Sequence, residues 1–347
     1  MAATLQRRDP GPRDVLIDIA YAGICHSDVD HAYQLRDSGK TMYPLVPGHE
    51  IAGIVSAVGA AVTKFIIGDR AGVGNMVGSC RVCDHCRAGL EQYCRGTRVL
   101  TYNSLGPEGQ PTHGGYSEKI VVDEDFVVKI PDGIPLQNAA PLLCAGITLY
   151  SPLRRWQAGP GKRVAIVGLG GLGHIGVKLA KAMGAHTTVL ELSEGKKADA
   201  QRMGADDYRL TRDPQTFIDL IGRFDLILST VPANVDLDAF LGLLNLDGTL
   251  VTLSVPSQPL KMSAVSLLRN RRSISGTLSG GLQETQEMIN FCARHKILAD
   301  VEVIHADQID AAYQRLLEGD VRYRFVIDAN TFDSPATARP IEALKAI

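Results

Sequence analysis

A glycine-rich hexapeptide, Gly168-Leu-Gly-Gly-Leu-Gly173, restricts the fold of this chain more than any other sequence feature. It lies between a short apolar run, 163–167, and an amphipathic stretch, 173–183, which together predict a strand, a tight turn and a helix. The first glycine permits the turn, the second lets the backbone approach a pyrophosphate, and the third lets helix and strand pack closely. Glu191 closes the next strand-like run, where an acidic side chain can bind a ribose. A glycine-rich turn without a ligand is the alternative, and this context favours the dinucleotide-binding fingerprint.

Strand-like and helix-like runs alternate from Gly161 onward. Strands are predicted at 163–167, 187–192, 225–229 and 249–254, with helices at 173–183 and 198–203. Alternation at this spacing predicts an α/β domain with a doubly wound parallel sheet. The residues expected to contact the dinucleotide are Gly168, Leu169, Gly170, Gly171, Leu172, Gly173, Glu191, Lys196, Thr230 and Val231.

The chain before residue 147 has a different texture, because short β-rich runs are separated there by Gly and Pro. This pattern is typical of a coiled β domain with many turns, and its predicted strands are 15–20, 53–58, 119–122 and 126–130. After Gly281 we expect a helix at 285–295, short strands at 301–305 and 323–327, and a surface tail at 330–347. The predicted domains are therefore 1–147, 148–282 and, as a return to the first domain, 283–347.

Composition and charge exclude several classes of protein. The 36 Lys and Arg residues nearly balance the 38 Asp and Glu residues, and no long charge run occurs. We therefore expect neither nucleic acid nor a membrane surface as a partner. The longest apolar runs are strand-sized, far below the ~20 residues of a membrane-spanning helix. Residues 1–13 are polar and basic and lack the apolar core of a signal peptide, so a cytoplasmic location is expected.

The seven cysteines are unevenly distributed, and four of them form the pattern Cys80-x-x-Cys83-x-x-Cys86-x7-Cys94. An odd count in a long chain without a signal peptide predicts reduced, metal-binding thiols rather than a disulfide framework. Four thiolates around Zn²⁺ leave no open position, which fits a structural site and not a catalytic one. An iron–sulfur cluster also uses four thiolates. The lobe 80–94 is rich in Arg, Gly and His and has no partner redox motif, which favours zinc.

A second set of metal-ligand residues is scattered: Cys25, the pair His49-Glu50, and Cys144. Taken singly, a buried Cys is a small apolar residue, which is also how we interpret Cys292. Two Cys and one His are the donors of an open catalytic zinc site, in which water or substrate takes the fourth position. Spacing alone does not establish this grouping.

The order of the motifs resembles that of the medium-chain zinc-dependent alcohol dehydrogenases, and the resemblance extends from Pro10 to Ile327. The sequence around Cys144 and the pair His26-Ser27 are most similar to the cinnamyl alcohol dehydrogenase branch. The matching runs are Gly23-Ile-Cys-His-Ser-Asp28, Pro47-Gly-His-Glu-Ile-Ala-Gly53, Gly68-Asp-Arg70, the four-cysteine lobe, Pro141-Leu-Leu-Cys-Ala-Gly146 and Gly168–Gly173. The resemblance implies a β-rich GroES-like catalytic domain, a Rossmann domain and a homodimer, with a tetramer as the alternative.

The resemblance also implies roles for single residues. Cys25, His49 and Cys144 match the ligands of the catalytic zinc, and Glu50 matches an acidic neighbour that can also bind the ion. Ser27 matches the hydroxyl that accepts the proton of the alcohol. Two zinc ions per chain are therefore expected, one at this site and one at the structural site Cys80, Cys83, Cys86 and Cys94.

Two departures from the family pattern affect the predictions. The relay histidine of the family falls on Asp30, and His31 follows one position later, so the relay ends at one or the other of these residues. Glu191 and Leu192 stand where the cinnamyl branch places serines for the 2′-phosphate of NADP. A carboxylate there can bind both ribose hydroxyls of NAD and would repel a 2′-phosphate, although Lys196 and Lys197 could attract one. We therefore expect NAD(H) to be favoured, with NADP(H) as the alternative.

The predicted function is hydride transfer between a primary alcohol or aldehyde and a nicotinamide cofactor, by a zinc-dependent alcohol dehydrogenase or aldehyde reductase acting on a small molecule. A polyol or secondary-alcohol dehydrogenase is the enzymatic alternative. An alternative of another class is a catalytically idle protein that binds zinc and a nucleotide. Zinc content separates the dehydrogenase from the idle protein, because an idle binder needs only the structural ion.

Overall fold

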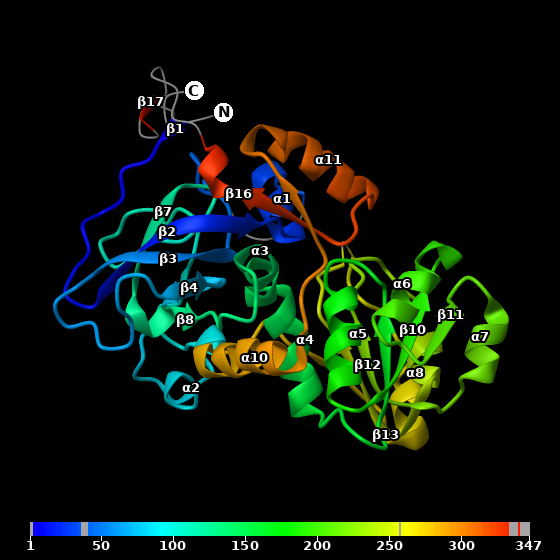
Figure 1. Cartoon of the computed structure of the whole chain (residues 1–347). Coiled ribbons are helices and arrows are strands. Elements are labelled where there is room, and N and C mark those ends of the chain that lie inside the picture. Colours follow the sequence, from blue (N-terminus) through cyan, green and yellow to red (C-terminus); the bar gives the residue numbers. More distant parts are fainter. Residues whose placement is uncertain (1–2, 36–40, 257, 333–338, 341–347) are drawn as a thin grey trace. The chain divides into compact units, whose positions relative to one another are not determined.

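The computed structural model describes residues 3–35, 41–256, 258–332 and 339–340, and forms two compact units (Figure 1). The first unit comprises Met1–Cys144 and Gly280–Ile347, and the second comprises Ala145–Ser279. The first unit is therefore discontinuous in sequence, because the whole second unit is inserted after Cys144. No described helix has the length and apolar content that a membrane span requires.

The first unit is built on a seven-stranded sheet of order β15-β16-β2-β3-β4-β8, with β7 also paired to β2 (Figure 1). In strand β2, every second residue from Val15 to Ile19 is apolar and buried, so Val15, Ile17 and Ile19 all face the core. The late strands β15 and β16 join this sheet through β2, so the return of the chain completes the first unit. The strands are β2 (Asp14–Gly23), β3 (Ile51–Val58), β4 (Arg70–Val73), β7 (Lys119–Asp123), β8 (Val128–Lys129), β15 (Val301–Ile304) and β16 (Arg324–Asp328).

The expected strand 126–130 is wrong in part, because the chain forms a short 3-10 helix, η2 (Glu124–Phe126), before β8. Glu124 is 1% exposed, and its carboxylate accepts hydrogen bonds from the backbone N–H groups of Thr63 and Lys64, both at 2.8 Å. The Asp123 side chain caps this turn by accepting from the Asp125 N–H. These carboxylate contacts hold a turn where the sequence pattern indicates only a strand.

Short strands and helices surround this sheet. Two-stranded sheets pair β1 (Ala3–Thr4) with β17 (Arg339–Pro340) and β5 (Met76–Gly78) with β6 (Val99–Leu100). Most of the expected surface tail 330–347 lies outside the described residues. The helical elements used below are α1 (His26–Tyr33), α2 (Asp84–Arg87), η1 (Glu91–Tyr93), η3 (Ala140–Leu143), α10 (Leu282–His295) and α11 (Ile309–Glu318).

The second unit contains a six-stranded parallel sheet of order β11-β10-β9-β12-β13-β14, which confirms the doubly wound α/β prediction. Its strands are β9 (Arg163–Val167), β10 (His186–Glu191), β11 (Asp207–Leu210), β12 (Phe224–Ser229), β13 (Leu244–Thr252) and β14 (Ser273–Gly276). Helices connect these strands and cover the sheet (Figure 1): α4 (Ala145–Arg155), α5 (Gly173–Ala182), α6 (Lys197–Arg202), α7 (Pro214–Asp219), α8 (Leu237–Gly242) and α9 (Ala264–Leu268). Strand β13 begins earlier than predicted, at Leu244, and its register against β12 shifts between Phe224 and Leu226.

Candidate active site and metal sites

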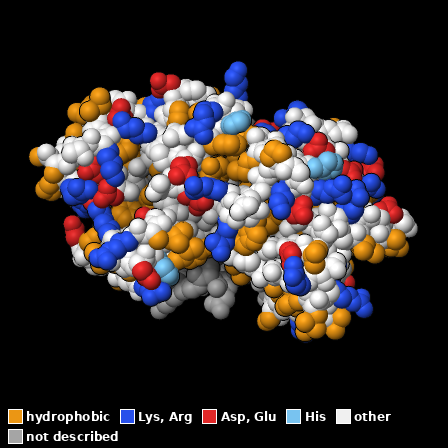
Figure 2. Space-filling model, turned by 90° about the horizontal axis from the view of Figure 1, so that it is seen from below, with side chains coloured by type: hydrophobic (Ala, Val, Ile, Leu, Met, Phe, Trp, Pro, Cys, Tyr) orange, Lys and Arg blue, Asp and Glu red, His pale blue; other side chains and the backbone are white. Residues whose placement is uncertain are grey.

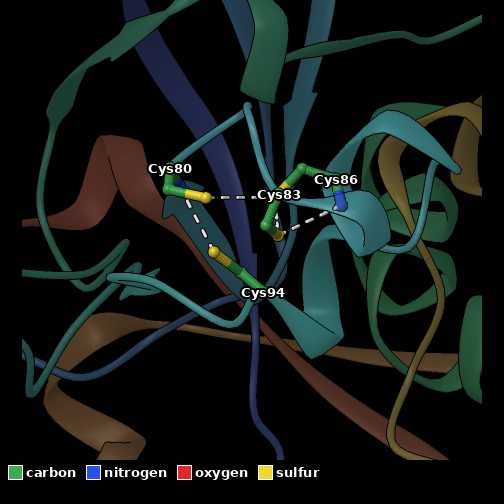
Figure 3. A group of neighbouring side chains, drawn as sticks. All are labelled: Cys80, Cys83, Cys86 and Cys94. Atoms are coloured by element: carbon green, nitrogen blue, oxygen red, sulfur yellow. Dashed lines mark hydrogen bonds between the residues drawn. The ribbon is translucent and has the colours of Figure 1, made fainter.

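The four-cysteine lobe, residues 80–94, brings the side chains of Cys80, Cys83, Cys86 and Cys94 together (Figure 3). The Sγ atoms of Cys80 and Cys86 are 3.9 Å apart, and those of Cys83 and Cys86 are 3.5 Å apart. Sulfur atoms around one tetrahedral Zn²⁺ with bonds of ~2.3 Å would be about 3.8 Å apart, so these thiols fit such an ion. None of the seven cysteines forms a disulfide. Hydrogen bonds from the backbone of Arg95 and Cys86 lower the pKa of Cys83 to about 6, which favours the thiolate.

Ion pairs tie this lobe to the sheet of the first unit. Arg81, between the first two cysteines, contacts Asp123 at 2.9 Å and Asp125 at 2.8 Å. Its guanidinium also lies 5.1 Å from the centre of the Phe126 ring. Basic and acidic side chains are likewise interspersed over the face that Figure 2 shows. The lobe is therefore anchored by partly exposed contacts, each of which contributes little alone.

A second group, the mixed cluster, consists of Cys25, His49, Glu50 and Cys144, whose ligand atoms all lie within 4.8 Å of one another. Cys25 precedes α1, His49 and Glu50 precede β3, and Cys144 follows η3. The Cys25 and Cys144 Sγ atoms are 3.9 Å apart, and His49 Nε2 lies 3.2 Å from Cys144 Sγ. The folded chain thus brings together the residues that the sequence offered only as a scattered set. Two thiols and an imidazole are the donors of an open zinc site, and the Glu50 carboxylate lies close enough to be a further ligand.

Asp28, which the sequence analysis gave no role, orients the histidine of this cluster. Its fully buried carboxylate lies 3.2 Å from His49 Nδ1. A carboxylate only accepts hydrogen bonds, so Nδ1 carries a proton, and Nε2 is directed toward Cys144. Burial lowers the pKa of His49, but the charge of Asp28 and hydrogen bonds to Asp28 and Cys25 outweigh it and raise the pKa to about 10. Metal and proton therefore compete for this imidazole.

Glu50 is held by Arg324, a partner that sequence reasoning missed. The two side chains form a hydrogen-bonded ion pair in which Glu50 is fully buried and Arg324 is 5% exposed. The other Glu50 carboxylate oxygen, Oε2, is buried and has no hydrogen-bond partner among the described residues. A buried oxygen without a partner is costly, and a metal ion in the mixed cluster would satisfy it. The available sequence signal was a single arginine at the start of the apolar run Phe325-Val-Ile327.

The candidate proton-relay residues lie on α1. Ser27 is in its first turn, two residues after Cys25, and His31 is four residues further, which puts both on one helix face. His31 is partly buried, accepts a hydrogen bond from Asn103 Nδ2 (3.2 Å) and packs edge-on against Tyr102. Burial lowers its pKa, which keeps the imidazole neutral and able to accept a proton. Asp30 is buried and lies 3.8 Å from His26.

The glycine-rich loop of the second unit has the geometry that the fingerprint requires. A Cβ on Gly173 would lie 1.9 Å from the Gly168 carbonyl oxygen, so only glycine allows this contact between helix and loop. Gly168 has φ +87, and a Cβ there would lie 2.5 Å from the Val231 side chain. A Cβ on Gly170 would meet nothing within 4 Å, which leaves room for a pyrophosphate beside the backbone. The Thr230 hydroxyl donates to the Val167 carbonyl (2.8 Å) and steadies the loop.

Glu191 is oriented differently from the sequence-based expectation. Both of its carboxylate oxygens accept hydrogen bonds from backbone N–H groups. Oε2 accepts from Leu169 N at 2.8 Å, and Oε1 accepts from Leu192 N at 2.7 Å. Lys196 Nζ lies 3.6 Å from Oε2. Glu191 therefore braces the glycine-rich loop, and its charge is partly neutralised. This arrangement weakens the argument that Glu191 repels a 2′-phosphate.

Family models match both units. The model described as "Alcohol dehydrogenase GroES-like domain" matches residues 11–132, and the one described as "Zinc-binding dehydrogenase" matches residues 171–294. The chain is 58% identical to NADP-dependent alcohol dehydrogenase C 1 of Mycolicibacterium smegmatis over 332 residues, 95% of each chain. The chain belongs to the medium-chain zinc-dependent alcohol dehydrogenases. The predicted GroES-like and Rossmann domains are thereby confirmed.

Two further relatives indicate the branch of the family to which this alcohol dehydrogenase belongs. It is 52% identical to aldehyde reductase YahK of Escherichia coli over 332 residues, 94% of each chain. A structure of a cinnamyl alcohol dehydrogenase from Sorghum bicolor matches with a TM-score of 0.92 and 41% identity, covering 96% of this chain and 94% of that one. These similarities confirm the prediction of the cinnamyl alcohol dehydrogenase-like branch.

The protein is a zinc-dependent alcohol dehydrogenase or aldehyde reductase that uses a nicotinamide cofactor on small-molecule alcohols or aldehydes. The alternative of a catalytically idle protein is therefore wrong. The expectation that NAD is favoured over NADP finds no support, because the relative from Mycolicibacterium smegmatis is named as NADP-dependent.

Proposed function

We propose that this alcohol dehydrogenase interconverts primary alcohols and aldehydes at a zinc ion bound by Cys25, His49 and Cys144. The observation that carries the proposal is the convergence of these ligand atoms, with Glu50, within 4.8 Å. A second zinc ion, held by Cys80, Cys83, Cys86 and Cys94, has a structural role. The ion at the mixed cluster supplies Lewis-acid polarisation of the substrate oxygen, and the nicotinamide supplies or accepts the hydride.

The residues of the chain divide the remaining work. Ser27 accepts the proton of the alcohol, and His31 continues the relay from the same face of α1. We assign the relay to His31 rather than Asp30 because His31 is partly exposed and neutral, whereas Asp30 is buried beside His26. Glu50 would be an additional ligand for the ion, and its carboxylate is held in the cluster by the ion pair with Arg324.

The proposed cofactor is NADP(H). The support is the name of the relative from Mycolicibacterium smegmatis, together with Lys196, whose ammonium lies beside a Glu191 already bonded to the backbone. We expect kcat/KM with NADPH to exceed that with NADH at least tenfold, or about 1.4 kcal/mol. Lys196→Ala should reduce this preference, and the exposed neighbour Lys197 provides the matched control, Lys197→Ala. An equal or higher kcat/KM with NADH would restore the NAD interpretation.

The proposed assembly is a homodimer formed through the second unit, in the cytoplasm. Strand β14 ends the order of the parallel sheet, and apolar side chains are exposed near it: Val265 at 50%, Leu268 at 78% and Leu278 at 55%. An open strand edge and exposed apolar residues favour pairing with a second copy. Sedimentation analysis checks this, and Leu268→Asp should shift the dimer toward monomer. A tetramer or a monomer of the parent would contradict the proposal.

Metal analysis and a kinetic panel test the proposed function together. We expect about two zinc ions per chain, and turnover of primary alcohols and aldehydes above that of polyols and secondary alcohols. One zinc ion per chain, or a preference for polyols, would overturn the assignment.

A further inference from the structure

Donors surround the buried Asp28 carboxylate on both of its oxygens. Oδ1 lies 3.2 Å from both Gly48 N and His49 Nδ1. Oδ2 accepts from Cys25 N at 2.8 Å and from the Tyr116 hydroxyl at 3.3 Å. Tyr116 therefore supplies a side-chain donor to the oxygen of Asp28 that does not face His49.

The Tyr116 hydroxyl remains a donor under ordinary conditions. Burial, followed by the negative charge of Asp28, raises the pKa of Tyr116 well above its usual value. The phenol therefore stays protonated beside the carboxylate. Tyr313 on α11 donates to the Tyr116 oxygen at 3.4 Å, a contact that the hydrogen bond from Tyr116 to Asp28 does not require.

The backbone keeps Tyr116 against the segment that carries His49. Tyr116 N donates to the Pro47 carbonyl at 3.0 Å, and Gly115 N donates to the Gly48 carbonyl at 2.9 Å. A Cβ on Gly48, which has φ +104, would lie 2.6 Å from the Tyr116 ring. The ring and the histidine loop are thus in direct contact.

Arg7 binds the loop 113–117, which carries Tyr116. Its guanidinium donates to the carbonyl oxygens of His113 at 2.6 Å and Gly114 at 2.7 Å, and to the Ser117 hydroxyl at 2.7 Å. Burial lowers the pKa of Arg7 to about 10, which leaves it charged at neutral pH. The loop 113–117 is therefore held from both sides, and Tyr116 has a defined position.

We propose that Tyr116 is a positioning residue for His49: its hydroxyl holds the Asp28 carboxylate, which fixes the orientation of the imidazole and leaves Nε2 free for the metal. The inference rests on the proposed role of His49 as a zinc ligand. Partners of this kind typically change metal affinity by 10–100-fold when removed. A purely space-filling role for the Tyr116 ring against Gly48 is the competing explanation.

Tyr116→Phe separates these explanations, because it keeps the ring and removes the hydroxyl. The zinc-loaded, full-length enzyme is mixed with a chromogenic chelator, and release of the two zinc ions is followed over time. We expect release from the mixed cluster about tenfold faster, unchanged release from the four-cysteine lobe, and a lower kcat with unchanged KM for the nicotinamide cofactor. The matched control, Tyr313→Phe, removes a neighbouring hydroxyl but leaves Tyr116 on Asp28, and should stay within twofold of the parent.

Three results would overturn the proposal. Parent-like zinc release and kcat in Tyr116→Phe, with a defect only in Tyr116→Ala, would mean that the ring packs and the hydroxyl does nothing. Equally accelerated release from both sites with a lowered Tm would mean general destabilisation. Two retained zinc ions in His49→Ala would show that the zinc assignment itself fails, which distinguishes that failure from a failure of Tyr116 alone.

Discussion

The four-cysteine lobe takes its ligand atoms from residues 80–94, whereas the mixed cluster takes them from Cys25, the pair His49-Glu50 and Cys144. Of the four cysteines of the lobe only Cys86 is buried, and the nearby charged contacts of Arg81 are partly exposed. In the mixed cluster His49 and Glu50 are buried, and buried charged partners hold them. A local ligand set can thus form with little help from the rest of the fold, but a dispersed set depends on it. Loss of the lobe should therefore affect stability, and loss of the mixed cluster should affect chemistry.

Cys144→Ala gives the sharpest test of this division. Loss of a ligand should empty the mixed cluster and lower kcat by roughly 10⁴-fold or more, because several kcal/mol of charge stabilisation disappear with the ion. The dinucleotide is expected to bind within about threefold of the parent, since the glycine-rich loop lies in the second unit. Zinc content, kcat and NADPH titration measure these effects. A retained second zinc ion with full turnover would break the comparison.

Ser27→Ala should leave both zinc ions in place and lower kcat by ~10²–10⁴-fold, the usual contribution of a positioned proton-transfer group. Ser27→Thr is the control, because it keeps a hydroxyl at the same position. Steady-state rates at neutral pH provide the measurement. If the alanine variant were as active as the parent, the relay would begin at another residue.

Cys83→Ser should release zinc from the lobe, since a hydroxyl replaces a thiolate poorly. We expect a loss of about 3 kcal/mol in the free energy of unfolding, or a Tm lower by roughly 6–12 °C. The kcat of the remaining folded enzyme should change much less than in Cys144→Ala. An unaltered Tm with full zinc content would contradict the structural role of the lobe.

Arg81→Ala should have the smallest effect, about 1 kcal/mol or less, because its ion pairs with Asp123 and Asp125 are partly exposed. High salt should reduce the difference between variant and parent in thermal unfolding. Arg95→Ala is the control on the same lobe, since the Arg95–Asp84 pair is more exposed. Zinc loss in Arg81→Ala would mean that the ion pairs, and not the thiolates, hold the lobe together.

Features that are local in sequence were predictable. The glycine-rich motif and the alternating runs around it specify the parallel sheet, because strand and helix periodicity are properties of neighbouring residues. The spacing of Cys80 to Cys94 likewise indicates one metal site. The 3-10 turn before β8 was not predictable, since it depends on Glu124 accepting hydrogen bonds from a distant loop.

Features that depend on the fold were predicted only through family resemblance or were missed. Periodicity and spacing could not group Cys25 and Cys144, which are 119 residues apart. The pairing of Glu50 with Arg324 spans 274 residues and gave no signal beyond one arginine beside an apolar run. The orientation of Glu191 could not be predicted from the sequence either, because the same carboxylate can face a ribose or, as here, the backbone.

The long separation between Glu50 and Arg324 has a consequence for synthesis on the ribosome. At about 5–20 residues per second, the arginine codon is translated about 14–55 s after that of its partner. During this interval Arg324 is not available to neutralise the Glu50 carboxylate, and the edge of β2 that β16 later pairs with is uncovered. A chain that stops before residue 324 therefore keeps a charge that is costly to bury and an open strand edge. Truncated products carry a built-in fold defect that chaperones and proteases can recognise.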